Sequence, residues 1–517
     1  MNEGVPSNPI DKNTKWNKIP QIAWFTLFIL GSVDLISTAG ETMIIPAIPD
    51  IINEFNITYS YSSWILSSYL IAGAVMTPIA STLSVIFGKK EILLTLMILY
   101  VIGTLLAGFS MNFSFLIVAR VIQGLGLAMF PLAFSIIQTV FPKESLAIGQ
   151  GIIIALFSSG SVIGLVVGGY VIDNFGWQTI FFVFIPISIL TIILINKKIN
   201  IPNEEILINE NPESIDTLTN KKLSKLNLID FKGTITLAFL ISSFLIVLSN
   251  LEEFDPQQFQ LTIVFTIITL NSLILFIFFS KRNKNPVISL GIFKQKILLF
   301  TNIILMISGL TTFMIYQMLP ILIRNPYPVG FEGDAIKVVE IQFPFMIVLF
   351  LVSVCSGFLV SKLGNIKPTL LGSIISLLGF FSIYFFHFSE ITIVVNLVVI
   401  GIGISFLQVG GFNIITTSTP KKLTEISVGV TSLLFIIGMS IGPVISSLFL
   451  QNFKTSIYGN NNFLPSSEAY NLIFLTAAII SLIPTIFILY IKKIKCFVNH
   501  YSELLELICL FLNLIMK

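Results

Sequence analysis

The sequence predicts an all-α integral membrane protein in which fourteen helices cross the bilayer, as two six-helix bundles with two inserted helices between them. Three observations lead to this prediction. Of the 517 residues, 55% are apolar and only 11% are charged, whereas soluble domains carry about 25% charged residues. Apolar runs of spanning length recur along the chain. A pattern of glycines in the first half returns in the second.

The apolar runs are near or above the length of about 20 residues that a helix needs to cross a bilayer. They cover residues 21–45, 61–86, 91–110, 114–140, 146–170, 179–195, 232–250, 260–280, 298–323, 339–361, 367–387, 391–416, 426–450 and 470–491. Because the count is even, both termini are expected on the same side of the membrane.

Basic residues fall on every second connection between these runs. They include Lys89, Lys90, Lys143, Lys197, Lys198, Lys281, Arg282, Lys362, Lys421, Lys422, Lys492 and Lys493. The other connections carry acids, among them Asp50, Glu54, Asp173, Glu252, Glu253, Asp255 and Glu390. The positive-inside rule therefore predicts a multi-pass protein of the cell membrane with both termini in the cytoplasm.

The same pattern divides the chain into regions. We expect a cytoplasmic tail at 1–20, a six-helix bundle at 21–195, a cytoplasmic loop at 196–230, two inserted helices at 231–280, a second six-helix bundle at 281–492 and a cytoplasmic tail at 493–517. The last tail alternates acids with apolar residues, which favours an amphipathic helix at the membrane interface. The outer loop 324–338 is long enough for a short hairpin or a lid.

The two bundles are expected to be repeats of one unit. The interval from Gly164 to Gly442 is 278 residues, that from Gly124 to Gly401 is 277, and that from Gly88 to Gly364 is 276. Single coincidences between glycines are common in a glycine-rich membrane protein, whereas three elements in one register are not. The chain therefore reads as two parallel repeats.

One charged residue lies inside an apolar run. Arg120 is about seven residues into the fourth run, where an arginine costs about 2.5–3.5 kcal/mol on insertion scales and usually faces a protein interior or a wet cavity. Gln123, Gly124 and Gly126 follow on the same helix, and small residues let a neighbouring helix approach closely. This combination favours a solute or proton pathway; the alternative is an arginine that snorkels from a helix end.

These motifs resemble those of the major facilitator superfamily, in particular its fourteen-helix drug:proton antiporter-2 family. Arg120-x-x-Gln123-Gly124-x-Gly126 is similar to the fourth-helix motif, whose arginine is associated with proton coupling. Gly151, Gly160, Gly164, Gly168 and Gly169 are similar to the antiporter motif of the fifth helix. Residues 285–293 and 174–177 also resemble family segments. The resemblance implies alternating access, a proton-coupled export activity and no cofactor.

The chain departs from this family at three places. Leu165 stands where the fifth-helix motif usually has proline. In the loop after the second helix, Val85 and Ile86 replace the usual acid and its basic neighbour, before Gly88, Lys89 and Lys90. The resemblance gives these last three residues a gating role, which the departures weaken or move. In the first helix, the usual Asp-Thr-Thr stretch falls near Gly40-Glu41-Thr42, with Asp34 a further acid upstream.

Two carboxyl groups in the first run are candidates for proton coupling. Asp34 lies about 20 Å from the cytoplasmic start of its helix and Arg120 about 10 Å from the opposite side, by a rise of about 1.5 Å per residue. If the two helices face one cavity, as the resemblance implies, Asp34 and Arg120 could pair, with Asp34 as the exchangeable carboxylate. Glu41, two turns further out, could attract cations or be a second proton site. The alternatives are a purely structural pair and a wetted rim residue.

Further polar residues inside the apolar runs are expected to line a substrate cavity or to hold helices together. They are Gln123, Asn302, Tyr316, Gln317, Gln408 and Asn413. A further set of residues is expected to pack helices and to adjust during gating: Gly124, Gly126, Gly151, Gly160, Gly164, Gly168, Gly169, Gly438, Gly442 and Pro443.

The leading functional hypothesis is export of amphipathic, cationic small molecules in exchange for protons. Export of a metabolite, peptide or siderophore and uncoupled facilitation remain open. The chain has no HExxH or Walker A sequence, no cysteine or histidine pattern that suggests a metal site, and no appended soluble domain. We therefore expect no enzyme, catalytic residue, metal or nucleic-acid partner. The expected partners are the solute, protons and the bilayer, and the expected state is a monomer.

Overall fold

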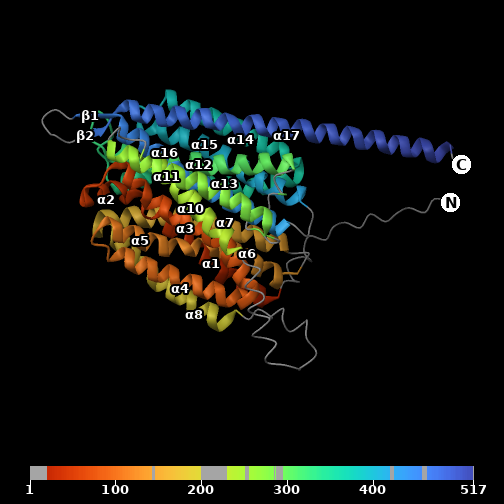
Figure 1. Cartoon of the computed structure of the whole chain (residues 1–517), viewed down its shortest axis with the longest axis horizontal. Coiled ribbons are helices and arrows are strands. Elements are labelled where there is room, and N and C mark those ends of the chain that lie inside the picture. Colours follow the sequence, from red (N-terminus) through yellow and green to blue (C-terminus); the bar gives the residue numbers. More distant parts are fainter. Residues whose placement is uncertain are drawn as a thin grey trace.

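The computed structural model describes residues 20–142, 146–199, 230–250, 256–283, 295–419, 424–456 and 463–515, with residues 286 and 291. These residues form long helices that lie side by side along the longest axis of the molecule (Figure 1). The expected tail 1–20 and loop 196–230 lie almost entirely outside the described residues.

The helices of the first half are α1 (Gln21–Thr42), η2 (Ile45–Ala47), α2 (Ile48–Phe55), α3 (Tyr59–Phe87), α4 (Lys89–Gly108), α5 (Phe113–Gly124), η3 (Leu125–Ala128), α6 (Met129–Val140), α7 (Leu146–Phe175) and α8 (Thr179–Lys198). Then follow α10 (Phe231–Ser249) and α11 (Pro256–Arg282). The second half contains α12 (Lys296–Arg324), α13 (Ala335–Leu363), α14 (Ile366–Phe385), α15 (Glu390–Ser418), α16 (Thr424–Asn452) and α17 (Ser467–Ile515).

Every predicted apolar run has a helix in the structure. Among the described residues, thirteen helices are long and apolar enough to cross a membrane, and a shorter apolar segment, Lys232–Leu248, lies in α10. Two details differ from the prediction. The predicted fourth helix is interrupted by the 3₁₀ segment η3, which contains Gly126. The chain also continues past α1 into η2 and α2, whose first turns contain Pro46 and Pro49.

The prediction of a purely α-helical chain needs one correction. A short antiparallel pair of strands, β1 (Lys454–Ser456) and β2 (Phe463–Pro465), connects α16 to α17. Residues 325–334, the centre of the loop expected to form a hairpin or a lid, contain turns and no strand. The C-terminal tail is helical to Ile515 as a direct continuation of α17, and its location at the membrane interface stays a prediction.

Charge distinguishes the two ends of the bundle. We call basic end the one that carries Lys89, Lys90, Lys197, Lys198, Lys281, Arg282, Lys296, Lys367, Lys492 and Lys493, and acidic end the one that carries Asp50, Glu54, Asp173, Asp334, Glu390 and Glu468. Contacts between distant segments fit these groups. Lys90 Nζ donates to the Asn196 carbonyl at 2.8 Å at the basic end, and Trp177 Nε1 donates to Glu54 at 2.6 Å at the acidic end.

The helix contacts repeat between the halves. Gly160, Gly164 and Gly168 of α7 lie so close to α1 that a Cβ atom would overlap the backbone of Leu35, Ala39 and Met43. In the second half, Gly438 and Gly442 of α16 lie against the carbonyls of Met306 and Leu310 of α12, and Ser446 Oγ donates to the Met314 carbonyl at 3.0 Å. Met306, Leu310 and Met314 each follow their α1 counterparts by 271 positions. The prediction of two repeats is confirmed in three dimensions.

The apolar core is divided unevenly between the two ends. At the acidic end one cluster contains residues of both halves, among them Ile48, Leu165, Leu319 and Phe345. Towards the basic end, one cluster belongs to the first half only, and another contains only residues of α12, α15 and α17. A further cluster joins α3 to α10, α11, α12, α15 and α16. The two halves therefore share their largest core at the acidic end.

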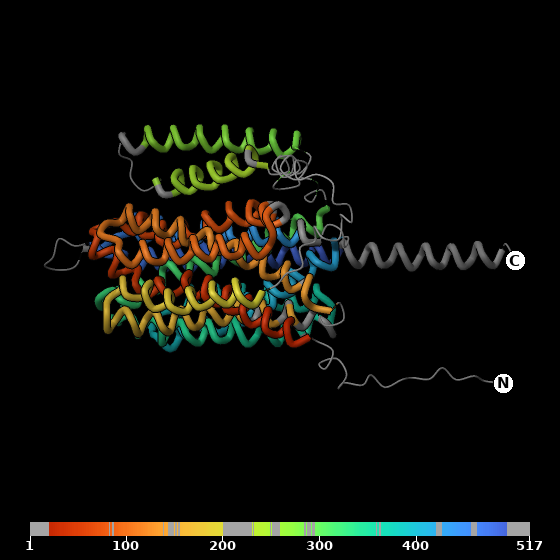
Figure 2. The backbone as a smooth tube through the Cα atoms, turned by 90° about the horizontal axis from the view of Figure 1, so that it is seen from below, coloured from red at the N-terminus to blue at the C-terminus, as the bar shows by residue number. Residues whose placement is uncertain are grey.

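The inserted helices lie along one flank. Figure 2 shows α10 and α11 beside the bundle, with α11 on the outside. Leu237, Ile241 and Leu245 of α10 pack in the cluster that contains Ile71 of α3 and Val444 of α16. Because α3 and α16 come from different halves, α10 contacts the line along which the halves meet.

Candidate functional site

Arg120 is completely buried in α5, and protein groups take the place of water around its guanidinium. Nε donates to the Ile65 carbonyl of α3 at 3.1 Å, and Nη1 donates to the Gly40 carbonyl of α1 at 3.1 Å and to Gln123 Oε1 at 2.6 Å. The plane lies 4.3 Å from the centre of the Tyr69 ring, a cation–π distance. Nη2 has no hydrogen-bond partner. Arg120 is therefore a buried interior residue, and the snorkelling alternative is wrong in this structure.

Two buried tyrosines fix α1 next to Arg120. Tyr69 of α3 donates its hydroxyl to the Ser37 carbonyl at 2.9 Å, and Tyr100 of α4 donates to the Ile36 carbonyl at 2.9 Å. Helical carbonyls accept a second hydrogen bond through their free lone pair. Together with the bond from Arg120 to Gly40, donors from three helices hold one short stretch of α1. Sequence reasoning missed both tyrosines, because aromatic residues in apolar runs usually face lipid or core.

Asp34 is completely buried in α1, and neither carboxyl oxygen has a hydrogen-bond partner. The hydroxyls of Ser37 and Ser68 are also buried without a partner. Buried polar groups are nearly always hydrogen-bonded, so each exception needs an explanation. An unpaired carboxylate in such surroundings is costly, whereas a neutral carboxyl group costs much less.

Glu41 lies two turns further along α1 and is 4% exposed. It is within electrostatic range of Arg120 of α5, Tyr69 of α3 and Tyr316 of α12. Glu41 is thus electrostatically coupled to a cation of its own half and to a tyrosine of the other half.

The predicted pair between Asp34 and Arg120 is not formed. Arg120 reaches α1 at Gly40, six residues beyond Asp34, which is about 9 Å along a helix. The prediction compared the depths of Asp34 and Arg120 along straight helices. Spanning helices tilt, and an arginine side chain extends several ångströms from its backbone, so equal depth does not ensure contact. The acid that Arg120 meets electrostatically is Glu41.

The glycines expected to pack helices do so wherever their surroundings are described. A Cβ atom at Gly124 would overlap the Tyr69 carbonyl, and one at Gly126 would lie 2.8 Å from the Tyr100 ring. Gly168 touches α1, while the next residue, Gly169, touches Val339 of α13 in the other half. Gly151 lies in α7, but its surroundings are outside the described part of the structure. Pro443 lies inside α16.

Gly88, Lys89 and Lys90 form the turn between α3 and α4. Gly88 has φ +101°, which an L side chain rarely adopts, and a Cβ atom there would meet the Glu91 carboxylate. Lys90 is bound to Asn196 at the end of α8. The side chains of Val85 and Ile86 are outside the described residues, so the predicted effect of these two departures stays a prediction.

The polar residues expected in a substrate cavity fall into two groups. Gln123, Asn302 and Asn413 are engaged within one half: Gln123 donates to Thr104 at 3.0 Å, Asn302 accepts from Thr431 at 2.6 Å, and Asn413 donates to Val409 in its own helix at 2.9 Å. Tyr316, Gln317 and Gln408 differ from one another in their contacts. Tyr316 donates to Met346 Sδ of its own half at 3.2 Å, Gln317 donates to Ser62 of the other half at 2.8 Å, and Gln408 is half-buried.

Gln342 of α13 is a candidate that sequence reasoning missed. It is completely buried, and neither its amide nitrogen nor its oxygen has a partner. The Gln317 oxygen on the neighbouring helix is also unpartnered. These amide groups could hydrogen-bond a solute or water. A single amide in an apolar run carries little sequence signal.

Several polar contacts join the halves at or near the acidic end, and the sequence predicted none of them. Arg324 at the end of α12 forms an ion pair with Asp50 of α2. Asp173 of α7 accepts from the backbone N–H groups of Ala335 and Ile336, at 3.0 and 2.9 Å. Gln451 accepts from the Tyr59 N–H at 3.2 Å, and Gln317 binds Ser62. Asp173 thus caps the first turn of a helix in the other half.

Comparison with known proteins decides the family. The model of the Major Facilitator Superfamily matches residues 30–443 and 301–495. The chain belongs to the major facilitator superfamily. The match covers both halves and the helices inserted between them, so the expected resemblance to the superfamily is confirmed.

Relatives within the superfamily are multidrug proteins at low identity. The multidrug transporter protein MdtP of Bacillus subtilis is 24% identical over 359 residues, which are 69% of this chain and 62% of the relative. Multidrug resistance protein 3 of the same organism is 26% identical over 57% of this chain and 54% of its own length. Both alignments cover less than two thirds of the relative. The multidrug resistance protein Stp of Mycobacterium tuberculosis is 26% identical over 77% of this chain and 70% of its own length.

A solved structure supports the fold. A bacterial homologue of the human lysosomal transporter Spinster superposes with a TM-score of 0.61 at 14% identity, over 90% of this chain and 96% of that one. At this identity the likeness establishes the superfamily fold alone. The family and the names of the relatives agree with the expectation that the chain is not an enzyme.

Proposed function

We propose that this transporter exports amphipathic, cationic small molecules in exchange for protons, by alternating access, as a fourteen-span protein whose basic end faces the cytoplasm. The relatives named for multidrug transport and the buried charged groups of the first half support this proposal. Lysines and arginines at one end of the bundle favour its cytoplasmic placement. The second half has no carboxylate at the positions equivalent to Asp34 and Glu41, which are Leu305 and Thr312.

We assign the structure to a state closed at the outside. The acidic end holds the ion pair of Asp50 with Arg324, the cap of Asp173 on α13, and the largest core shared by both halves. Towards the basic end, two clusters each belong to one half, and the smaller cluster that joins α3 to the second half lies beside the inserted helix α10. This distribution favours access from the cytoplasm, the side on which an exporter loads its substrate.

The observation that carries the proposed coupling is the unpartnered carboxyl group of Asp34 in a half that also contains Arg120 and Glu41. Because a carboxylate without a partner is costly there, Asp34 carries a proton in this state. Substrate entry, or opening of the acidic end, then releases the proton when a cation or water reaches the carboxyl group. Arg120 fixes α1 and acts electrostatically on Glu41, which attracts the cation.

The test is ethidium efflux from proteoliposomes under an imposed pH gradient. We expect gradient-driven efflux in the wild type, none in Asp34→Asn, and wild-type efflux in Glu468→Gln, an exposed acid of the acidic end that serves as control. Protein levels are compared in every preparation.

Each other outcome has a defined meaning. Efflux that survives in Asp34→Asn but not in Glu41→Gln moves the proton site to Glu41. Efflux that survives in both variants contradicts the scheme. If the wild type moves no lipophilic cation, transport of a metabolite replaces drug export.

A further inference from the structure

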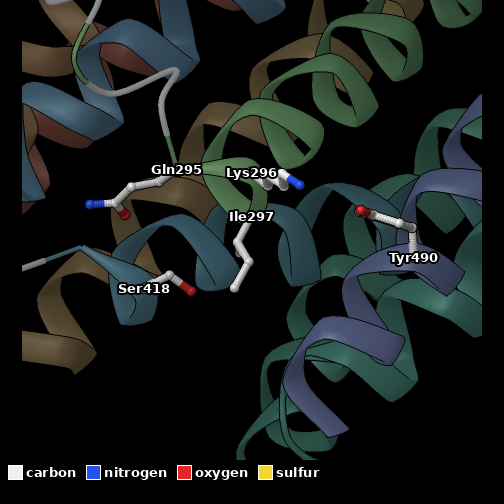
Figure 3. A pocket seen from close by; sticks show the side chains of 5 residues that line it. All are labelled: Gln295, Lys296, Ile297, Ser418 and Tyr490. Atoms are coloured by element: carbon white, nitrogen blue, oxygen red, sulfur yellow. The ribbon is translucent and has the colours of Figure 1, made fainter. Parts of the chain in front are cut away.

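A cavity at the basic end lies apart from the buried charged groups. It has a volume of about 430 Å³ and is lined by Gln295, Lys296, Ile297, Ser418 and Tyr490. These residues come from the start of α12, the end of α15 and the middle of α17 (Figure 3). The cavity is thus formed within the second half, between three helices far apart in sequence.

The lining residues favour an anion. The Lys296 ammonium group and the Tyr490 hydroxyl point towards one another across the cavity (Figure 3). Ser418 and Gln295 add a hydroxyl and an amide, and none of the five residues is acidic. Among the described residues, Lys296 makes no ion pair. Its charge and these donors match the oxygens of a phosphate group.

The cavity also lies at the depth of lipid headgroups. Lys296 is the first residue of α12, Ser418 is the last residue of α15, and Tyr490 is three residues before the end of the apolar span Ser467–Lys493. All three helices therefore leave the apolar layer beside the cavity. Basic pockets between spanning helices on the cytoplasmic side are suited to anionic lipid headgroups.

An aromatic cluster continues from the cavity towards the bilayer centre. The Phe300 ring lies 4.7 Å from the Phe487 ring and 5.2 Å from the Tyr490 ring, centre to centre. Phe300 and Phe487 are partly exposed, and Tyr490 is 41% exposed. Both phenylalanines lie about one turn deeper than the polar lining. A fatty-acyl chain can pack against these two rings. A free phosphate ion has no apolar group that could do so.

We propose that this cavity binds one anionic phospholipid, with its phosphate at Lys296, Ser418 and Tyr490 and an acyl chain against Phe300 and Phe487. The site is independent of the transported solute, and it joins α12, α15 and α17 through their common ligand. Its test needs no transport measurement, so it can fail without affecting the proposed function.

The experiment is native mass spectrometry of the delipidated full chain, titrated with phosphatidylglycerol or with phosphatidylcholine of the same acyl chains. We expect one tightly bound phosphatidylglycerol and weaker phosphatidylcholine. One lysine near a membrane surface contributes about a fivefold change in affinity, so Lys296→Gln should weaken phosphatidylglycerol binding about fivefold. Lys367→Gln, an exposed lysine of the same end that does not line the cavity, should bind as the wild type does.

Three results would overturn the proposal. They are equal affinity in wild type and Lys296→Gln, an equal loss in Lys367→Gln, and full displacement of the lipid by millimolar inorganic phosphate. The last would identify a free-anion site. Equal melting temperatures of the wild type and Lys296→Gln in phosphatidylcholine verify that the variant is folded. Tyr490→Phe, which keeps the ring and removes the hydroxyl, should weaken headgroup binding without changing that temperature.

Discussion

Arg120 illustrates how a charge is kept inside a bilayer protein. Insertion of an arginine costs about 2.5–3.5 kcal/mol on translocon scales, while a hydrogen bond to a charged group contributes about 1.5–3 kcal/mol. The guanidinium donates to Ile65, Gly40 and Gln123 and lies over Tyr69. These bonds are enough to offset the cost, and they need the planar fork of arginine.

A lysine at position 120 should therefore be unable to make the contacts that Arg120 makes. Lysine is a compact point charge and cannot reach the carbonyls of two helices and an amide at once. We expect Arg120→Lys to lower pH-driven ethidium efflux about tenfold or more, since loss of one such bond costs about 1.5–3 kcal/mol, and to lower the melting temperature. Arg282→Lys, at an exposed position, is the control. Unchanged efflux and melting in Arg120→Lys would refute this account.

At the scale of the helix, small residues set the packing. In α7 and α16, glycines bring the helix backbone against the carbonyls of α1 and α12. Such contacts between helices in lipid depend on close approach and on van der Waals packing, because lipid gives no hydrophobic driving force. A single methyl group at these positions must push two helix backbones apart.

This argument predicts opposite effects for glycines in the same helix. Gly442→Ala should lower the melting temperature of the purified protein, because its Cβ atom would overlap the Leu310 carbonyl. Gly164→Ala should do the same through Ala39. In Gly429→Ala the new methyl group meets nothing within 4 Å, so the variant should be neutral, or more stable by about 0.5–1 kcal/mol from helix propensity. Equal melting of all three would contradict a packing role.

The elements differ in how far the sequence predicted them. The length of the apolar runs predicted the helices, because a segment in lipid must form its backbone hydrogen bonds within itself. Glycine spacing gave the repeat, because the close contacts of Gly160 and Gly438 recur in the same order. The break at η3 carries no such signal, since its residues Leu125–Ala128 are as apolar as a continuous helix.

The candidate site was predicted less completely. The sequence identified Asp34, Glu41 and Arg120, because charges in apolar runs are costly and rare. It paired Arg120 with Asp34 instead of Glu41, because helix tilt and the direction of a side chain depend on the tertiary structure. The contacts of Asp50 and Asp173 were missed for a similar reason. An acidic residue in a connection is expected to be solvated, and its partner in the other half cannot be identified from the sequence.

For the whole molecule, we expect the contacts at the acidic end to influence which side of the protein is closed. Asp173 caps α13 across the interface, while Asp334 caps the same helix from within its own half, where it accepts from the Lys337 N–H at 2.7 Å. A lost cap costs about 1 kcal/mol. Only the loss of Asp173 should change the balance between the two states of access.

We therefore predict that Asp173→Ala separates the halves at the acidic end and that Asp334→Ala does not. Spin labels replace the exposed residues Phe175 of α7 and Ile391 of α15, in a chain whose three cysteines are replaced by serine. Asp173→Ala should raise the population at the longer distance about fivefold, and more when combined with Asp50→Asn. Identical distance distributions in Asp173→Ala and Asp334→Ala would contradict the prediction.

The location of the charged groups has a consequence for how coupling can work. Asp34, Glu41, Arg120, Gln123 and both buried tyrosines belong to the first half, tied to one another by α1 and its neighbours. A rigid rotation of one half against the other leaves every distance among them unchanged. The proton site should therefore respond to what moves relative to the first half, which is the solute, water and groups of the opposite half such as Tyr316, which is electrostatically coupled to Glu41. If the proposed coupling is correct, the first half binds the proton, and the second half, which lacks those acids, changes the surroundings of the proton site when the conformation changes.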